Sequence, residues 1–139
     1  MNWFFWAMLS AVFAGATAVL AKIGVRDVDS NLATAVRTLV VLVFAWAVAL
    51  ATNPINAVFA FSKRTWLFLA LSGIATGLSW LCYFRALQLG EASKVAPVDK
   101  LSVVFVLIFA ALFLGESLTT KTMVGGALIA AGAVVLAWK

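Results

Sequence analysis

The sequence contains no histidine and few other residues that carry catalytic or metal-binding chemistry. Its 139 residues include one cysteine, Cys82, and only five acidic side chains against ten basic ones. Zinc sites and histidine-based catalysis are therefore excluded, because their usual ligands and proton carriers are missing. Cys82 lies within an apolar run and has no second cysteine with which to form an internal disulfide. We expect no cofactor, no metal and no enzymatic activity.

Polar residues in general are too scarce for a soluble domain of this size. Hydrophobic residues make up 65% of the chain and charged residues 11%, and the mean hydropathy is +1.13. This composition indicates an integral membrane protein whose surroundings are membrane lipid. The net charge of +5 does not indicate nucleic acid as a partner, since the basic residues are scattered between apolar runs rather than gathered in one face.

Five apolar stretches predict an all-α integral membrane protein with five transmembrane helices, forming a single domain over residues 1–139. Ser30 and Asn31 are expected to cap the second helix. Residues 55–64 are too few to cross a bilayer, and we interpret them as an interfacial loop. The helices are expected at about residues 3–21, 32–52, 66–84, 96–115 and 122–138.

The fourth helix carries an unusual pair of charges. Its apolar run from Leu101 to Leu114 covers only about 21 Å of a hydrocarbon core about 30 Å thick, so the helix must begin earlier, near residue 96. Asp99 and Lys100 then lie inside the membrane, about one turn from its surface. Side chains of adjacent helical residues point about 100° apart, so we expect that these two do not pair and that each needs its own partner. Lys100 alternatively extends back to the lipid headgroups.

Arg37 is a third charge expected within the membrane. It lies about 8 Å inside the second helix, where it either extends back to the headgroups or pairs with another residue. The second and fourth helices begin on the same membrane side, and Arg37 and Asp99 lie at comparable depth. An ion pair between them is therefore geometrically permitted. Such a pair would either fix helix packing or take part in substrate binding or ion coupling.

The third helix brings polar and aromatic side chains into its second half. Ser79, Trp80 and Tyr83 are candidates for a substrate pathway, and a packed helix interface is the alternative for Trp80. Glycines on the third and fifth helices are candidates for close helix packing or dimer contact. These glycines are Gly73, Gly77, Gly125, Gly126 and Gly132.

Basic residues between the helices favour one orientation. Five lie on the side of the C-terminus and three on the opposite side. By the positive-inside rule this favours an N-out, C-in orientation in the inner membrane. The two sides differ by only two basic residues, so insertion in both orientations is the alternative. The five are Lys22, Arg26, Arg85, Lys94 and Lys139, and the three are Lys63, Arg64 and Lys121.

Four motifs in the second half of the chain indicate a family. They read YFRAL at 83–87, AP at 96–97, FLGESLT at 113–119 and GGALIAAG at 125–132. In this order and spacing they resemble the EamA domain of the drug/metabolite transporter superfamily. The resemblance covers most of the chain and is sharpest from residue 83 to residue 138.

Larger members of that superfamily look like two five-helix repeats of opposite orientation around a central cavity. This chain has one EamA-type repeat, so the resemblance implies a half-transporter that pairs with itself, most simply as an antiparallel homodimer, or with a related half-transporter. It also implies a cavity lined by the first, third and fourth helices. Trp80, Tyr83, Asp99 and Lys100 are then candidate pathway residues, together with Ser79.

The implied function is transport of small organic solutes or metabolites, with export as the expected direction. The alternative is a non-transporting membrane subunit or scaffold. In the related four-helix small multidrug resistance proteins, a glutamate in the first helix exchanges protons for cationic drugs. Residues 3–21 contain no acidic side chain, so that mechanism is not expected here unless Asp99 takes the role.

Overall fold

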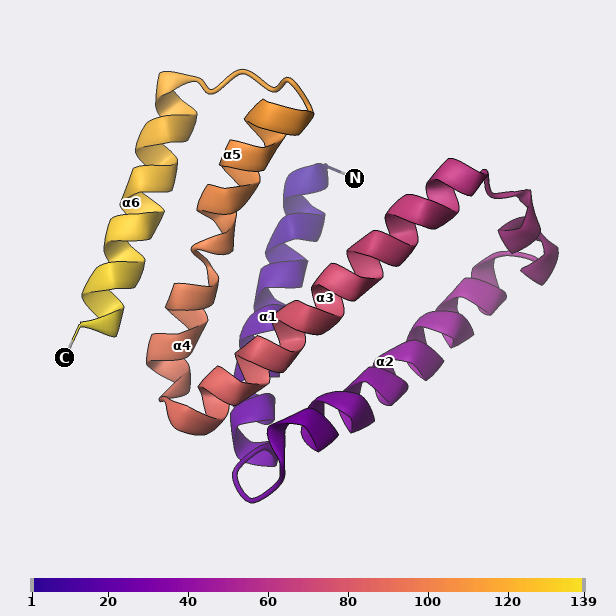
Figure 1. The fold of residues 1–139 in the computed structure, drawn as a ribbon, viewed down its shortest axis with the longest axis horizontal. Helices are drawn as coiled ribbons and strands as arrows, with labels where there is room; N and C mark the ends of the chain where they lie inside the picture. The colour runs from indigo at the N-terminus through magenta and orange to yellow at the C-terminus, as the bar shows by residue number, and fades with distance from the viewer. Residues whose placement is uncertain (1, 139) are drawn as a thin grey trace. The chain divides into compact units, whose positions relative to one another are not determined.

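The computed structural model describes residues 2–138, and the regular structure in that range is helical. Within it, five helical segments are long and apolar enough to cross a membrane, which confirms the expected fold class. Lys139, which entered the charge comparison, lies outside the described residues. The elements are α1 Trp3–Gly24, α2 Ser30–Thr52, the 3-10 helix η1 Ile55–Ala60, α3 Lys63–Leu89, α4 Ala92–Asp99, α5 Ser102–Phe113 and α6 Thr120–Ala137 (Figure 1).

The chain forms two compact units. The first combines residues 1–22 with residues 89–139 and contains α4, α5, α6 and nearly all of α1. The second comprises residues 23–88 and contains α2, η1 and α3.

In the first unit, α6 packs against both α4 and α5, which follow one another along its side (Figure 1). Small residues permit this approach: Ala110 of α5 and Ala133 of α6 are buried. Gly126 is also buried, and a Cβ added there would lie 2.8 Å from Cδ1 of Leu107. Apolar helices in lipid associate through such close packing, because lipid removes the hydrophobic drive that operates in water.

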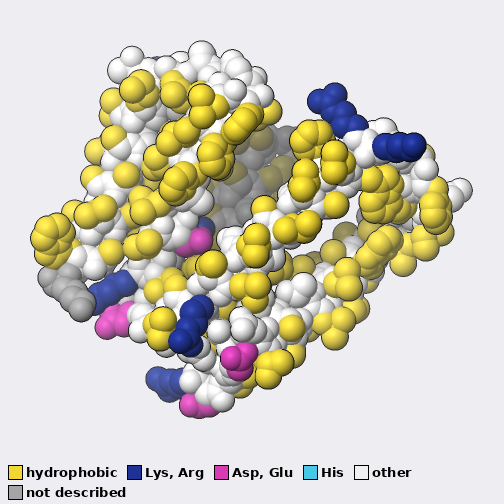
Figure 2. Space-filling model, in the orientation of Figure 1, with side chains coloured by type: hydrophobic (Ala, Val, Ile, Leu, Met, Phe, Trp, Pro, Cys, Tyr) yellow, Lys and Arg dark blue, Asp and Glu magenta, His cyan; other side chains and the backbone are white. Residues whose placement is uncertain are grey.

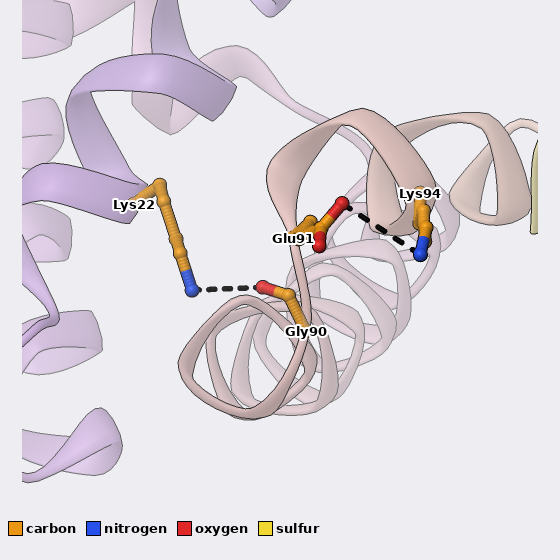
Figure 3. Close-up of polar contacts among 4 residues, drawn as sticks. All are labelled: Lys22, Gly90, Glu91 and Lys94. Atoms are coloured by element: carbon orange, nitrogen blue, oxygen red, sulfur yellow. Dashed lines mark hydrogen bonds and ion pairs between the residues drawn. The ribbon is translucent and has the colours of Figure 1, made fainter.

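The end of α1 is tied to the segment that precedes α4. The Lys22 ammonium donates a hydrogen bond to the Gly90 carbonyl over 2.8 Å (Figure 3). Beside this contact, Glu91 lies 3.7 Å from Lys94 of the next turn. A polar contact therefore holds two segments that are far apart in sequence within the first unit.

The second unit is an antiparallel pair, α2 and α3, joined by η1. Asp29 caps α2, because its carboxylate accepts hydrogen bonds from the amides of Asn31 (2.9 Å) and Leu32 (3.1 Å). The expectation that Ser30 or Asn31 is the cap was therefore wrong. Near this end, Gln88 donates to the Val28 carbonyl over 2.8 Å.

The helix α3 is longer than the expected range of 66–84. It begins at Lys63 because the Ser62 hydroxyl accepts the Thr65 amide at 3.1 Å, which is the contact of a helix N-cap. It continues to Leu89 and stops before Gly90. Hydrophobic side chains cover much of the visible surface, and two basic groups gather where η1 meets α3 (Figure 2). Of the segment 55–64, interpreted as an interfacial loop, residues 55–60 form η1, which is not one of the five spans, whereas residues 63 and 64 already belong to α3.

Replacement of Gly126 by leucine should destabilise the first unit. The added side chain meets Leu107 at the α5–α6 contact, and overpacking of this kind costs about 1–3 kcal/mol. Unfolding in sodium dodecyl sulfate, followed by circular dichroism, measures the change. Gly125→Leu is the matched control, since open space surrounds a Cβ at that position. Equal destabilisation by both substitutions would contradict the packing described.

Candidate functional site

The fourth membrane span is broken near its middle. The helix α4 ends at Asp99 and α5 begins at Ser102, so the expectation of one continuous helix over residues 96–115 was wrong. Pro97 lies inside α4, three residues before the break, and we infer that it weakens this span. Proline has no amide hydrogen, and its ring clashes with the carbonyl one turn earlier, so it breaks or kinks a helix.

The chain passes the break through tighter turns. The amides of Lys100 and Leu101 donate to the carbonyls three residues earlier, over 3.1 and 3.0 Å, and the Lys100 amide is shared with the Ala96 carbonyl over 3.3 Å. The amides of Val103 and Val104 do the same over 3.0 and 2.9 Å. Such three-residue bonds belong to 3-10 geometry, which often marks a functional hinge when it interrupts a longer helix. Irregular backbone at membrane depth is tolerated where it is buried in protein or lines a water-filled cavity.

Asp99 and Lys100 form an ion pair at this break. The Lys100 nitrogen lies 3.6 Å from a carboxylate oxygen of Asp99, so the expectation that the two do not pair was wrong. The angular argument compares only the directions in which the side chains leave the helix, whereas the long, flexible lysine side chain reaches across that angle. The side chains are 38% and 57% exposed for Asp99 and Lys100, so the attraction alone contributes little to stability.

In the second unit, Arg37 lies over the rings of α3. Its guanidinium carbon is 4.2 Å from the centroid of the Trp80 ring and 5.5 Å from that of Phe84. Phe84 is buried, whereas Arg37 and Trp80 are half-buried. Tyr83 lies within electrostatic reach of the same guanidinium. We call Arg37, Trp80, Tyr83 and Phe84 the arginine–aromatic cluster.

The structure thus groups the candidate residues within each unit. Asp99 and Lys100 meet in the first unit, and Arg37 and Trp80 meet in the second. Ser79 is exposed on α3 and does not belong to the arginine–aromatic cluster. Sequence reasoning missed Phe84, although its position four residues after Trp80 places both rings on one face of α3.

The candidate glycines divide into two groups. Gly126 packs against Leu107 within the chain. Open space surrounds a Cβ at the other four, so no neighbouring atom in the described chain requires glycine at Gly73, Gly77, Gly125 or Gly132. Their role in helix packing or dimer contact stays a prediction.

These features define a helical, multi-pass membrane protein with a charged break in one span. Comparison with known proteins identifies the family. The EamA-like transporter family matches residues 1–138, and the chain belongs to this family. It is 56% identical over 136 residues, 98% of this chain and 96% of the relative, to a Sinorhizobium protein described as "Uncharacterized transporter in cobO 3'region". No solved structure matches the chain. The protein is accordingly a membrane transporter of this family.

Replacement of Pro97 by alanine should join α4 to α5. It restores an amide donor and removes a defect that costs a helix about 3 kcal/mol. We expect amide hydrogen exchange at residues 100–104 to slow by at least about tenfold, a change of about 1.4 kcal/mol in opening free energy. Mass spectrometry of the protein in nanodiscs measures this exchange. Pro54→Ala, at the start of η1, is the control and should leave these amides unchanged. Unchanged exchange in Pro97→Ala would show that the proline does not cause the break.

Proposed function

We propose that the protein transports small organic solutes or metabolites across the inner membrane, with export as the physiological direction. The observation that carries the proposal is the broken fourth span with Asp99 and Lys100 at the break. Transporters commonly bind their substrates where helices are discontinuous, because free backbone groups and helix ends then face the solute. Ionisable residues inside a membrane are usually functional. Trp80, Tyr83, Asp99 and Lys100 are the proposed pathway residues.

We further propose that the working unit is a dimer of half-transporters. The chain has five spans matching one family domain, and an inverted pair of such repeats is a general plan for transporters. The partner is a second, antiparallel copy or a related half-transporter. The open face at Gly73 and Gly77 of α3 supports a contact with another helix. An N-out, C-in orientation stays a prediction, and dual insertion would supply the antiparallel copy.

The ion pair between Arg37 and Asp99 also stays a prediction. Each residue has another neighbour in its own unit, Trp80 for Arg37 and Lys100 for Asp99. The attraction of a 3.6 Å ion pair between partly exposed groups is small, so these neighbours do not prevent a different pairing during transport.

Asp99→Asn should reduce solute flux with the dimer intact. Loss of the carboxylate leaves Lys100 uncompensated at the break, and we expect about a tenfold loss, equivalent to about 1.4 kcal/mol. Uptake of a mixed panel of amino acids, sugars, carboxylates and organic cations into proteoliposomes measures flux, and chemical cross-linking measures the dimer. Glu91→Gln is the control, because it removes an exposed carboxylate that is likewise paired with a lysine. No flux of any solute by the unaltered protein would favour a non-transporting subunit or scaffold.

Exchange of the two charges tests the Arg37–Asp99 pair. If the residues pair, Arg37→Asp and Asp99→Arg should each impair folding or transport, and the double variant should recover most of the loss. Coupling energies between contacting residues are about 0.5–3 kcal/mol, so the recovery should be measurable. Folded yield in detergent and proteoliposome flux are the readouts. Absence of any recovery in the double variant would rule the pair out.

A further inference from the structure

Arg37 is a cation well inside a membrane helix. It lies seven residues after Ser30, the first residue of α2, and therefore about 10 Å along the helix from its start. A charged side chain at such depth usually pairs or faces a cavity. The simplest alternative is that the flexible side chain extends back to the headgroups.

The two ring contacts of Arg37 argue against that alternative. On α3, Trp80 is about 14 Å from Leu89 at the helix end, and Phe84 is about 8 Å from it. The guanidinium lies closer to the deeper ring, at 4.2 Å from Trp80 against 5.5 Å from Phe84. A side chain that sought the headgroups would approach the shallower ring instead. The guanidinium therefore lies beside the ring that is farther from the end of α3.

The contact with the Trp80 ring attracts the positive charge of Arg37 but supplies no hydrogen-bond acceptor for its N–H groups. A ring placed over the guanidinium carbon attracts the positive charge, but the five N–H donors of arginine lie in the guanidinium plane and need acceptors at its edge. No hydrogen bond or ion pair joins Arg37 to another described residue of the second unit. Neither α2 nor α3 contains a carboxylate that could serve.

We propose that Arg37, stacked on Trp80, recognises an oxyanion group, a carboxylate or phosphate, on the transported solute. The planar fork of arginine matches such groups with two parallel hydrogen bonds, and charged hydrogen bonds of this kind are among the strongest in proteins. Trp80 fixes the orientation of the fork. This inference rests on the proposed transport function and names the class of solute, small organic anions.

Binding to the full-length protein in phosphatidylcholine nanodiscs tests the proposal without requiring transport. Isothermal titration calorimetry with benzoate, glutarate and phenyl phosphate measures oxyanion affinity, and tetraethylammonium serves as the cationic probe. We expect at least one oxyanion to bind and the cation not to compete. Arg37→Gln should weaken that binding by at least about tenfold, because it removes both the charge and the fork. Binding of none of the three oxyanions would overturn the proposal.

Two further variants separate recognition from folding. Arg37→Lys keeps the charge but loses the fork, and Trp80→Leu keeps Arg37 but removes its platform. Each should weaken binding by about three- to tenfold while the circular dichroism spectrum is unchanged. Arg64→Gln is the matched control, since Arg64 lies 5.8 Å from the Phe68 ring near the exposed start of α3. Equal weakening by Arg64→Gln would show a general charge effect and overturn the proposal.

Two other occupants of the site are outcomes of the same measurement. If Arg37 serves Asp99 instead, Asp99→Asn should change oxyanion affinity as much as Arg37→Gln does. If an anionic lipid headgroup occupies the site, nanodiscs containing phosphatidylglycerol should abolish binding. Either result overturns the proposal. Proteoliposome flux distinguishes failure of this proposal from failure of the proposed function. Flux of neutral or cationic solutes alone would support transport and contradict the anion site. Arg37-dependent binding of an oxyanion without any flux would support the anion site and contradict transport.

Discussion

Every backbone polar group in the hydrocarbon core must find its partner within the protein, and the architecture of this chain follows from that constraint. Continuous helices satisfy it in α1, α2, α3 and α6. The fourth span satisfies it differently, because the amides on either side of its break bond to carbonyls three residues earlier before α5 begins. Among the described residues, this irregular stretch coincides with the ion pair of Asp99 and Lys100.

Packing within the first unit depends on the size of side chains more than on their hydrophobicity. Gly126, Ala110 and Ala133 are small and buried, and they let α6 approach α4 and α5. Large apolar residues such as Phe113 and Leu128 are 78% and 68% exposed, which suits contact with lipid or with another helix. In a membrane, exposure of such residues carries no penalty, so the small residues decide which faces meet.

The number of membrane spans and the all-α fold class could be predicted from the sequence because each span is a long apolar run. The break after Pro97 was not predicted. The span length was counted back from the apolar run that begins at Leu101, which placed the proline near the membrane entry, where a break in the helix is not expected. The expectation that Asp99 and Lys100 do not pair was wrong because it ignored the length and flexibility of the lysine side chain. The stacking of Arg37 on Trp80 depends on the register between two antiparallel helices, about which the periodicity of each helix says nothing.

Polar partners are scarce inside a membrane, and the charged residues of the two units are compensated in different ways. Asp99 and Lys100 compensate one another within two residues and leave no net charge at the break. The guanidinium of Arg37 lies over the Trp80 ring. Its net charge is unchanged, because a ring quadrupole attracts a cation without neutralising it. A neutral pair attracts ions of neither sign strongly, whereas a stacked guanidinium retains both charge and donors. If the solute is an anion, as we propose, electrostatics assigns its recognition to the arginine–aromatic cluster rather than to the neutral pair at the break.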